Sequence, residues 1–449
     1  MDYSNIFKDK RITVLGLGLL GRGVGDVEFL AKCGAKILVT DKKSDVELAE
    51  SVAKLEKYPN VAFKLGGHDA EDVKHCDMVL KAAGVPLDSK EIATARDAGV
   101  PVVMSTALFA KYAMDAGAKI VGVTGTRGKS TVSHMIHHVL ISAFAKASVD
   151  KRAFLGGNIR GISTLAMLPD VKKGDIAVLE LDSWQLQGFG DLKISPHISV
   201  FTNLMPDHQN YYKDMDEYFS DKANIFRYQK VGDVLIIGNS IADKVRAAQQ
   251  PLDPVVPERI PSDWKLKIVG EHNRENASFA NAALQALGLS DDEIRAGLES
   301  FESVEGRLQF VREVNGVKIY NDNNATTPEA TIAALRALGE NITLIVGGSE
   351  KGLALEELVS EIKKNVPHVV LLTHPNYKGS VRLAEALRKA AVAYDEAGDL
   401  PAAITSALEK KEKGTVLFSP AFASFGMFKN EYERNDQFLE IVRQMEDAA

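Results

Sequence analysis

The stretch Gly122-Val123-Thr124-Gly125-Thr126-Arg127-Gly128-Lys129-Ser130-Thr131 decides the fold of the central part of the chain. It follows a short apolar run, Ile120–Val123, and precedes a helix-like segment, Ser130–Ala145. A glycine-rich turn between a strand and a helix, ending in Gly-Lys-Ser-Thr, is typical of a loop that wraps phosphate groups. We therefore predict that this loop binds ATP or GTP, with Lys129 on the phosphate oxygens and Ser130 on Mg²⁺.

Short apolar runs alternate with helix-like segments along the rest of the chain. The other runs are Ile12–Leu15, Lys36–Thr40, Ala177–Leu181, His197–Thr202, Val234–Ile237, Ile342–Val346, Val369–Leu372 and Thr415–Phe418. The helix-like segments include Val46–Lys57, Asn276–Leu287 and Leu355–Lys364. Leu308–Tyr320 looks like a hairpin with its turn at Asn315-Gly316. The alternation predicts an α/β protein with largely parallel sheets.

Length and composition limit the class of protein. The chain has 449 residues, which suggests about three domains at roughly 150 residues each. Its hydrophobic fraction of 45% excludes a mostly disordered chain, and its net charge of −7 disfavours a protein that binds nucleic acid or a membrane surface. No apolar run is long enough to span a bilayer. With two cysteines and no signal peptide, we expect a cytoplasmic protein.

A second glycine loop, Gly16-Leu17-Gly18-Leu19-Leu20-Gly21, follows the first apolar run. The next run ends in Asp41, at about the spacing of an acid that meets a ribose. The pattern favours a nucleotide whose pyrophosphate lies at a helix N-terminus. Two alternatives stay open at this point. The loop could be a tight turn that needs small residues for packing, or part of a Rossmann oxidoreductase.

Candidate metal ligands follow two of the central strands. Glu180 ends an apolar run, and His208 lies on a polar loop just past the end of another. Both positions suit ligands of a metal ion beside bound phosphates. Lys222 lies on a predicted helix, where its spacing alone indicates an ordinary solvated lysine.

Seven motifs resemble those of the Mur ligases, in the same order and over essentially the whole chain. They are Gly122–Thr131, Glu180–Leu186, Asn203–His208, Gly270–Ala277, Tyr320–Thr326, Gly347–Gly352 and Leu417–Phe425. The last three are most similar to the branch that adds D-glutamate to UDP-N-acetylmuramoyl-L-alanine. Other Mur ligases or folylpolyglutamate-type ligases, with a different acceptor or amino acid, are the alternative within this chemistry.

The resemblance implies three α/β domains and an ATP-driven amide synthesis through an acyl phosphate, in peptidoglycan precursor synthesis. It implies a Rossmann-like domain for the UDP sugar at 1–110, a P-loop-type ATP domain at 111–303 and a Rossmann-like amino-acid domain at 304–449. The expected partners are UDP-N-acetylmuramoyl-L-alanine, D-glutamate and ATP, and we expect a monomer. Two Mg²⁺ ions are expected as cofactors. Lys222 matches a lysine that is carbamylated in the family and so becomes a metal ligand.

The resemblance also implies a set of site residues. The catalytic residues would be Lys129, Glu180, His208 and Lys222, and the metal ligands Ser130, Glu180, His208 and Lys222. ATP would be bound by Gly125, Thr126, Arg127, Gly128, Lys129, Ser130, Thr131, Asn273, Asn276, Arg307 and Asp322. The UDP substrate would be bound by Gly18, Leu19, Leu20, Asp41, Lys42, Lys43, Gly84, Asn158 and Asp182. D-Glutamate would be bound by Thr326, Lys351, Ser424 and Phe425.

Some positions depart from the usual family pattern. Ala82-Ala83 replaces a Ser-Pro pair on the uridine side, so a hydroxyl that could bind the nucleotide is missing. Asp182 stands where Ser is usual, and Arg127 where Asn is usual. Other residues that differ from the usual family residues at their positions are Leu20, Glu305-Gly306, Asn324 and Gly426.

Overall fold

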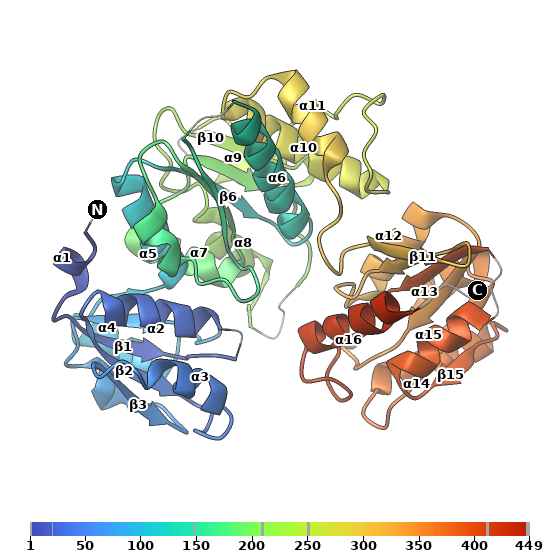
Figure 1. Cartoon of the computed structure of the whole chain (residues 1–449), viewed down its shortest axis with the longest axis horizontal. Coiled ribbons are helices and arrows are strands. Elements are labelled where there is room, and N and C mark those ends of the chain that lie inside the picture. Colours follow the sequence, from blue (N-terminus) through green and yellow to red (C-terminus); the bar gives the residue numbers. More distant parts are fainter. Residues whose placement is uncertain are drawn as a thin grey trace. The chain divides into compact units, whose positions relative to one another are not determined.

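The computed structural model describes residues 2–19, 21–147, 150–207, 211–248, 252–409 and 413–445. The chain divides into two compact units (Figure 1). The first consists of Met1–Ile260 and Asn276–Leu298, and the second of Pro261–Glu275 and Glu299–Ala449. No helix in the described ranges is long and apolar enough to cross a membrane.

The first unit begins with a five-stranded parallel sheet of order β3-β2-β1-β4-β5. Its strands are β1 (Arg11–Leu15), β2 (Lys36–Asp41), β3 (Val61–Leu65), β4 (Met78–Lys81) and β5 (Val102–Val103). The helices of this segment are α1 (Ser4–Phe7), α2 (Arg22–Lys32), α3 (Ala49–Leu55), η1 (Ala70–Val73), α4 (Lys90–Asp97) and α5 (Ser105–Asp115).

A second five-stranded parallel sheet, of order β10-β9-β6-β8-β7, lies in the same unit. Its strands are β6 (Lys119–Thr124), β7 (Ala153–Gly157), β8 (Ile176–Glu180), β9 (Ile198–Phe201) and β10 (Val234–Ile237). The helices that follow these strands are α6 (Lys129–Ala147), η2 (Leu165–Asp170), α7 (Ser183–Leu192), α8 (Met215–Ala223), η3 (Asn239–Ile241) and α9 (Ala242–Ala247). Two further helices, α10 (Glu271–Ala286) and α11 (Asp291–Ser300), each have residues in both units.

One apolar core joins the two sheets of the first unit. It contains Val39 of the first sheet, Phe109 of α5 and Ile120 of the second sheet. All three side chains are fully buried. Because burial of apolar surface is the main force in folding, this shared core holds the two sheets together as one body.

The second unit holds a six-stranded sheet of order β11-β12-β16-β13-β14-β15. Its strands are β11 (Gln309–Val314), β12 (Val317–Asn321), β13 (Ile342–Val346), β14 (His368–Leu372), β15 (Asp395–Ala397) and β16 (Gly414–Phe418). The pairs are parallel except for β11 with β12. The helices are α12 (Pro328–Leu338), α13 (Glu356–Asn365), α14 (Lys378–Lys389), α15 (Leu400–Glu409) and α16 (Glu431–Gln444).

Both faces of this sheet are covered. Along β13, Leu344 and Val346 belong to a core with α12, α13 and α14, whereas Ile345 belongs to a second core with α15 and α16. Successive strand residues point to opposite faces, so an unbroken apolar run is what a sheet with two covered faces requires. This confirms the α/β expectation for the run Ile342–Val346.

The predicted hairpin is confirmed at the edge of the same sheet. Val314 of β11 pairs with Val317 of β12, and the two residues between them, Asn315 and Gly316, have φ angles of 50° and 80°. Positive φ at both positions is the geometry of a tight hairpin turn that matches the twist of its strands, and Asn-Gly is the pair that adopts it most readily.

Candidate active site

The phosphate loop connects β6 to α6 as predicted. Its curvature needs glycine at Gly125, where φ is 144° and a Cβ atom would lie 2.0 Å from the Thr202 hydroxyl oxygen. The Lys129 ammonium group folds back over the loop and donates to the carbonyl oxygens of Gly125 at 2.9 Å and Thr126 at 3.1 Å. The cation therefore lies on the loop whose backbone is expected to cradle phosphate.

Two residues at the end of β9 hold this loop in shape. Thr202 donates its hydroxyl proton to the carbonyl oxygen of Arg127 at 2.6 Å. Asn203 accepts N–H bonds from Thr126 and Arg127, at 3.0 Å and 2.9 Å. The sequence interpretation assigned no role to either residue. One feature could have pointed to these two residues: they follow the carboxyl end of β9, which pairs in parallel with β6. Polar residues at the carboxyl ends of parallel neighbours lie at the same edge of the sheet.

Two predicted magnesium ligands follow neighbouring strands. Glu180 ends β8, is 3% exposed and pairs in register with Val123 of β6, while Ser130 is a buried residue in the first turn of α6. A hydroxyl and a carboxylate are the hard oxygen donors that suit Mg²⁺. The third predicted ligand, His208, lies outside the described residues. Within the described ranges, no group of three or more His, Cys, Asp or Glu side chains could hold a metal ion.

Lys222 is not the solvated lysine that its spacing indicates. It is 1% exposed on α8, and its ammonium nitrogen contacts the carbonyl oxygen of Gly125 at 3.0 Å and the hydroxyl of Thr124 at 3.3 Å. Burial, followed by the nearby charge of Lys129, holds the pKa of Lys222 well below its usual value. A buried lysine beside the phosphate loop is therefore poised to lose its proton.

The departure at Asp182 has a local structural reason. Asp182 is the N-cap of α7, and its carboxylate accepts the backbone N–H of Gln185 at 2.7 Å. The Gln185 side chain in turn accepts the backbone N–H of Asp182, which completes a capping box. The carboxylate thus satisfies a helix terminus, a task that serine can also perform.

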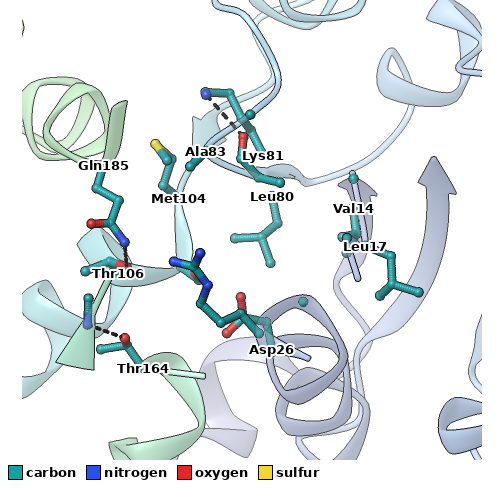
Figure 2. A pocket seen from close by; sticks show the side chains of 18 of the residues that line it. Val14, Leu17, Asp26, Leu80, Lys81, Ala83, Met104, Thr106, Thr164 and Gln185 are labelled. Carbon is teal, nitrogen blue, oxygen red and sulfur yellow. Dashed lines mark hydrogen bonds between the residues drawn. The ribbon is translucent and has the colours of Figure 1, made fainter. Parts of the chain in front are cut away.

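A cavity of about 220 Å³ lies in the first unit, beside the second glycine loop (Figure 2). Three of the predicted UDP-substrate residues line it: Gly18, Leu19 and Gly84. The figure shows Asp26 on one side and Thr106, Thr164 and Gln185 on another. Asp41, Lys42, Lys43, Asn158 and Asp182 are not part of this lining, and Leu20 lies outside the described residues.

Asp41 is turned into the glycine loop of its own chain. One carboxylate oxygen accepts the N–H groups of Leu17 at 2.8 Å and Gly18 at 3.2 Å, and the other accepts that of Lys43 at 2.9 Å. Burial alone would raise the pKa of Asp41, but these three donors bring it below its usual value. The predicted ribose contact would have to be made by a carboxylate that already binds three N–H groups, and it stays a prediction.

The four predicted D-glutamate residues lie on loops at one edge of the sheet in the second unit. The loops follow β12, β13 and β16, which are parallel neighbours, so their carboxyl ends meet. Lys351 donates to the hydroxyl oxygen of Thr326 at 3.1 Å. Ser424 is buried and its hydroxyl oxygen has no hydrogen-bond partner within the described residues, while Phe425 is 60% exposed. A cation, hydroxyl groups and an exposed ring thus meet at this edge.

Asp322 and Arg307 also lie in the second unit. The Asp322 carboxylate accepts from the backbone N–H of Leu308 at 3.0 Å and from the hydroxyl of Ser419 at 2.8 Å. Burial raises the pKa of Asp322 to about 7, although those two donors and Arg307 oppose the rise. Arg307 itself is exposed. The two predicted ATP ligands therefore stand in very different surroundings.

The two asparagines of the Gly270–Ala277 motif lie in different units. Asn273, in the second unit, donates its side-chain amide to the carbonyl oxygen of Val269 at 2.8 Å. Asn276, in the first unit, lies against the phosphate loop, since a Cβ atom on Gly128 would come within 2.5 Å of its amide oxygen. A glycine is needed at 128 for this close approach. Asn276 is thus placed beside the proposed ATP site.

Arg434 of α16 ties two of the second unit's loops together. It is fully buried, and its guanidinium donates to the side-chain and backbone oxygens of Asn323 at 2.8 Å and 2.9 Å and to the backbone oxygen of Phe422 at 3.3 Å. These oxygens belong to the loops that carry Asp322 and Ser424. No role was predicted for Arg434, whose main partner, Asn323, lies 111 positions away in the chain.

Replacing this arginine should destabilise the protein. Arg434→Ala leaves three buried acceptors without their donor, so we expect its free energy of unfolding to fall by about 3 kcal/mol or more. Arg443→Ala, an exposed arginine on the same helix, is the matched control and should change little. Urea unfolding of both variants measures the difference. Equal stability of the two variants would contradict the structural role of Arg434.

Three protein-family models match the chain. A model described as the Mur ligase MurD-like N-terminal domain matches residues 10–104, the Mur ligase middle domain matches 123–256, and the Mur ligase glutamate ligase domain matches 306–422. A protein of Roseiflexus sp. (strain RS-1), named UDP-N-acetylmuramoylalanine–D-glutamate ligase, is 34% identical over 96% of this chain and 98% of its own length. A protein of Clostridium tetani with the same name is 30% identical, with 99% of each chain covered.

Solved structures share the fold. The UDP-N-acetylmuramate–alanine ligase of Thermotoga maritima has a TM-score of 0.62 and 19% identity, with 97% of this chain and 99% of its own covered. The MurF ligase of the same organism, crystallised with ADP, has a TM-score of 0.58 and 16% identity, with 98% and 96% covered. At such identities the likeness concerns the fold alone.

Proposed function

This chain belongs to the Mur ligase family, and from that premise we propose that it joins D-glutamate to UDP-N-acetylmuramoyl-L-alanine with hydrolysis of ATP to ADP and phosphate. The observation that carries the proposal is similarity over almost the full length to ligases named for this reaction. The phosphate loop, with Lys129 folded over it, supplies the ATP chemistry that such a reaction needs.

The reaction needs an activated carboxylate, since a free carboxylate is a poor electrophile. An oxygen of the alanyl carboxylate attacks the γ-phosphorus of ATP, the bond to the bridging oxygen breaks, and ADP leaves. The amine of D-glutamate then attacks the carbonyl carbon of the acyl phosphate, loses a proton and displaces phosphate. Lys129 and the N–H groups of the phosphate loop stabilise the charge on the transferred phosphoryl group.

Mg²⁺, when bound, neutralises charge on the phosphate oxygens. Ser130 and Glu180 supply oxygen donors for one ion, and we assign His208 and Lys222 to a second. Lys222 suits this role best as a carbamate, because an ammonium group cannot bind a cation and Mg²⁺ prefers oxygen ligands to a neutral amine. Its lowered pKa and deep burial favour the neutral amine, which is the form that reacts with carbon dioxide.

The remaining assignments divide the substrates among three regions. We assign residues 1–110 mainly to the UDP sugar, 111–303 mainly to ATP and 304–449 mainly to D-glutamate. Lys351, Thr326, Ser424 and Phe425 hold the amino acid, since its two carboxylates need a cation and hydroxyl donors. We also assign Asn273, Asn276, Arg307 and Asp322 to the binding of ATP. We further propose that the enzyme is a monomer, that it acts in the cytoplasm, and that its reaction belongs to peptidoglycan precursor synthesis.

A substrate panel tests the proposal. The purified protein is given UDP-N-acetylmuramoyl-L-alanine, ATP, Mg²⁺ and one amino acid at a time, and phosphate release is followed. We expect release with D-glutamate and only background release with L-glutamate, L-lysine or meso-diaminopimelate. Release with another amino acid, and none with D-glutamate, would assign the chain to another ligase of the same family. A folate acceptor in place of the UDP sugar tests the folylpolyglutamate-type alternative.

A further inference from the structure

The cavity beside the second glycine loop contains a cation that has no assigned role. Arg22 is the first residue of α2 and directly follows the loop. It lines the cavity together with Gly18, Leu19 and Gly84, which are predicted to bind the UDP substrate. In the described part of the lining, Lys81 is the other basic residue.

Lys81 is turned into its own loop. It is 2% exposed, and its ammonium group donates to the carbonyl oxygens of Val85 at 2.7 Å and Ala82 at 3.3 Å. Burial lowers the pKa of Lys81 to about 8. Its donors hold the loop that forms one wall of the cavity, so Lys81 is a poor candidate for direct contact with a ligand.

Some N–H groups of the glycine loop are already bound, while those of Leu19 and Gly21 have no acceptor among the described residues. The N–H groups of Leu17 and Gly18 are bound by Asp41, and that of Gly16 donates to the carbonyl oxygen of Thr40. The opposite wall carries Ala82 and Ala83 and so offers no hydroxyl. The lining also carries the hydroxyl groups of Ser105 and Thr106, but the negative charge of a diphosphate is stabilised best by a cationic side chain.

Arg22 has N–H groups that can bind such an anion. One guanidinium nitrogen donates to the side-chain amide oxygen of Asn158 at 3.0 Å. This is the only side-chain hydrogen bond of Arg22 within the described residues, and its charge also acts on the nearby Asp26 carboxyl, whose pKa it lowers against the larger effect of burial. A guanidinium has five N–H donors, so most of them stay available to a ligand.

The same hydrogen bond orients Asn158. Because its amide oxygen accepts from Arg22, the amide NH₂ must point the other way. That NH₂ makes no hydrogen bond to another described residue, so its two N–H donors are available to a ligand that extends from the cavity past Arg22 to Asn158, which lies outside the lining. Asp26, one turn further along α2, also lines the cavity, but its carboxylate accepts from the hydroxyl of Ser163 at 2.6 Å.

We propose that the Arg22 guanidinium binds the diphosphate of the UDP substrate and orients the side-chain amide of Asn158 as a second hydrogen-bond donor to that diphosphate. In this chain the pair supplies the polar contacts that Ala82 and Ala83 cannot make. The inference rests on the proposed function for the identity of the nucleotide. It assigns to Arg22 the discrimination between uridine diphosphates and uridine itself.

Calorimetric titration with three ligands tests the proposal: UDP-N-acetylmuramoyl-L-alanine, UDP and uridine. Arg22→Ala should weaken binding of the two diphosphates by about 10- to 100-fold and leave uridine binding unchanged. Arg22→Lys should restore part of the loss, because it keeps the charge without the planar fork. Lys32→Ala, at the exposed end of the same helix, is the control and should bind all three ligands normally.

Steady-state kinetics adds a second readout. Arg22→Ala should raise KM for the UDP substrate with kcat and KM for ATP unchanged, as expected for a contact equal in the ground and transition states. An equal loss for uridine and UDP, or no loss for either, would overturn the assignment while leaving the ligase activity in place. If the unaltered protein binds no uridine nucleotide and forms no product, the proposed function itself fails.

Discussion

Lys129→Ala is expected to lose ATP-dependent turnover by at least about a hundred- to a thousand-fold. The Lys129 ammonium group lies over the phosphate loop, on the carbonyl oxygens of Gly125 and Thr126. Phosphoryl transfer depends almost entirely on positioning and charge stabilisation, so loss of this cation removes stabilisation of the transition state. Phosphate release under saturating substrates, measured for the variant and the unaltered protein, gives the ratio.

The fold should survive this change. Lys129 is half-buried and donates to the carbonyl oxygens of Gly125 and Thr126 rather than packing in the apolar core, so the variant should unfold at nearly the same temperature. Lys146→Ala, an exposed lysine in the last turn of the same helix, is the matched control and should keep full activity. Retained activity in Lys129→Ala would remove the phosphate-loop assignment.

Lys222→Ala is expected to lose at least about a hundred-fold in kcat, since it would delete the metal ligand that we propose at this position. Short carboxylates such as acetate or formate should restore part of the activity, because they can occupy the space of the missing carbamate. Lys222→Arg should be equally impaired and should not be rescued, since a guanidinium stays protonated and fills the same space.

Carbamylation can also be observed directly. Protein equilibrated with ¹³C-bicarbonate should show a carbamate carbon resonance that is absent from both Lys222 variants. Full activity in Lys222→Ala would end the carbamate proposal. A resonance that persists in Lys222→Ala would assign the carbamate to another amine.

The features that sequence predicted well depend on local patterns. The phosphate loop is a continuous stretch, and the alternation of apolar runs reports parallel strands such as Ile342–Val346 directly. The hairpin at Asn315-Gly316 follows from the backbone preferences of those two residues. Each of these signals lies within about ten neighbouring residues, so a single sequence suffices to read it.

The features that escaped prediction depend on contacts between distant segments. Helical spacing indicates a solvated Lys222, and only the pairing of β6 and β9 beside α8 buries it. Arg22 and Asn158 are 136 positions apart. The hydrogen bonds from the glycine-loop N–H groups of Leu17 and Gly18 to Asp41 were not predicted either, and the ribose contact of Asp41 stays a prediction. Tertiary packing decides each of these cases.

One isotope measurement tests directly whether this protein joins D-glutamate to the UDP substrate through an acyl phosphate. UDP-N-acetylmuramoyl-L-alanine labelled with ¹⁸O in its alanyl carboxylate is incubated with ATP, Mg²⁺ and D-glutamate, and both products are analysed by mass spectrometry. We expect a UDP product heavier by one glutamyl residue and one ¹⁸O atom in each released phosphate, since the carboxylate oxygen is transferred through the acyl phosphate. Unlabelled phosphate, or a UDP substrate recovered without added glutamate while ATP is consumed, would contradict it.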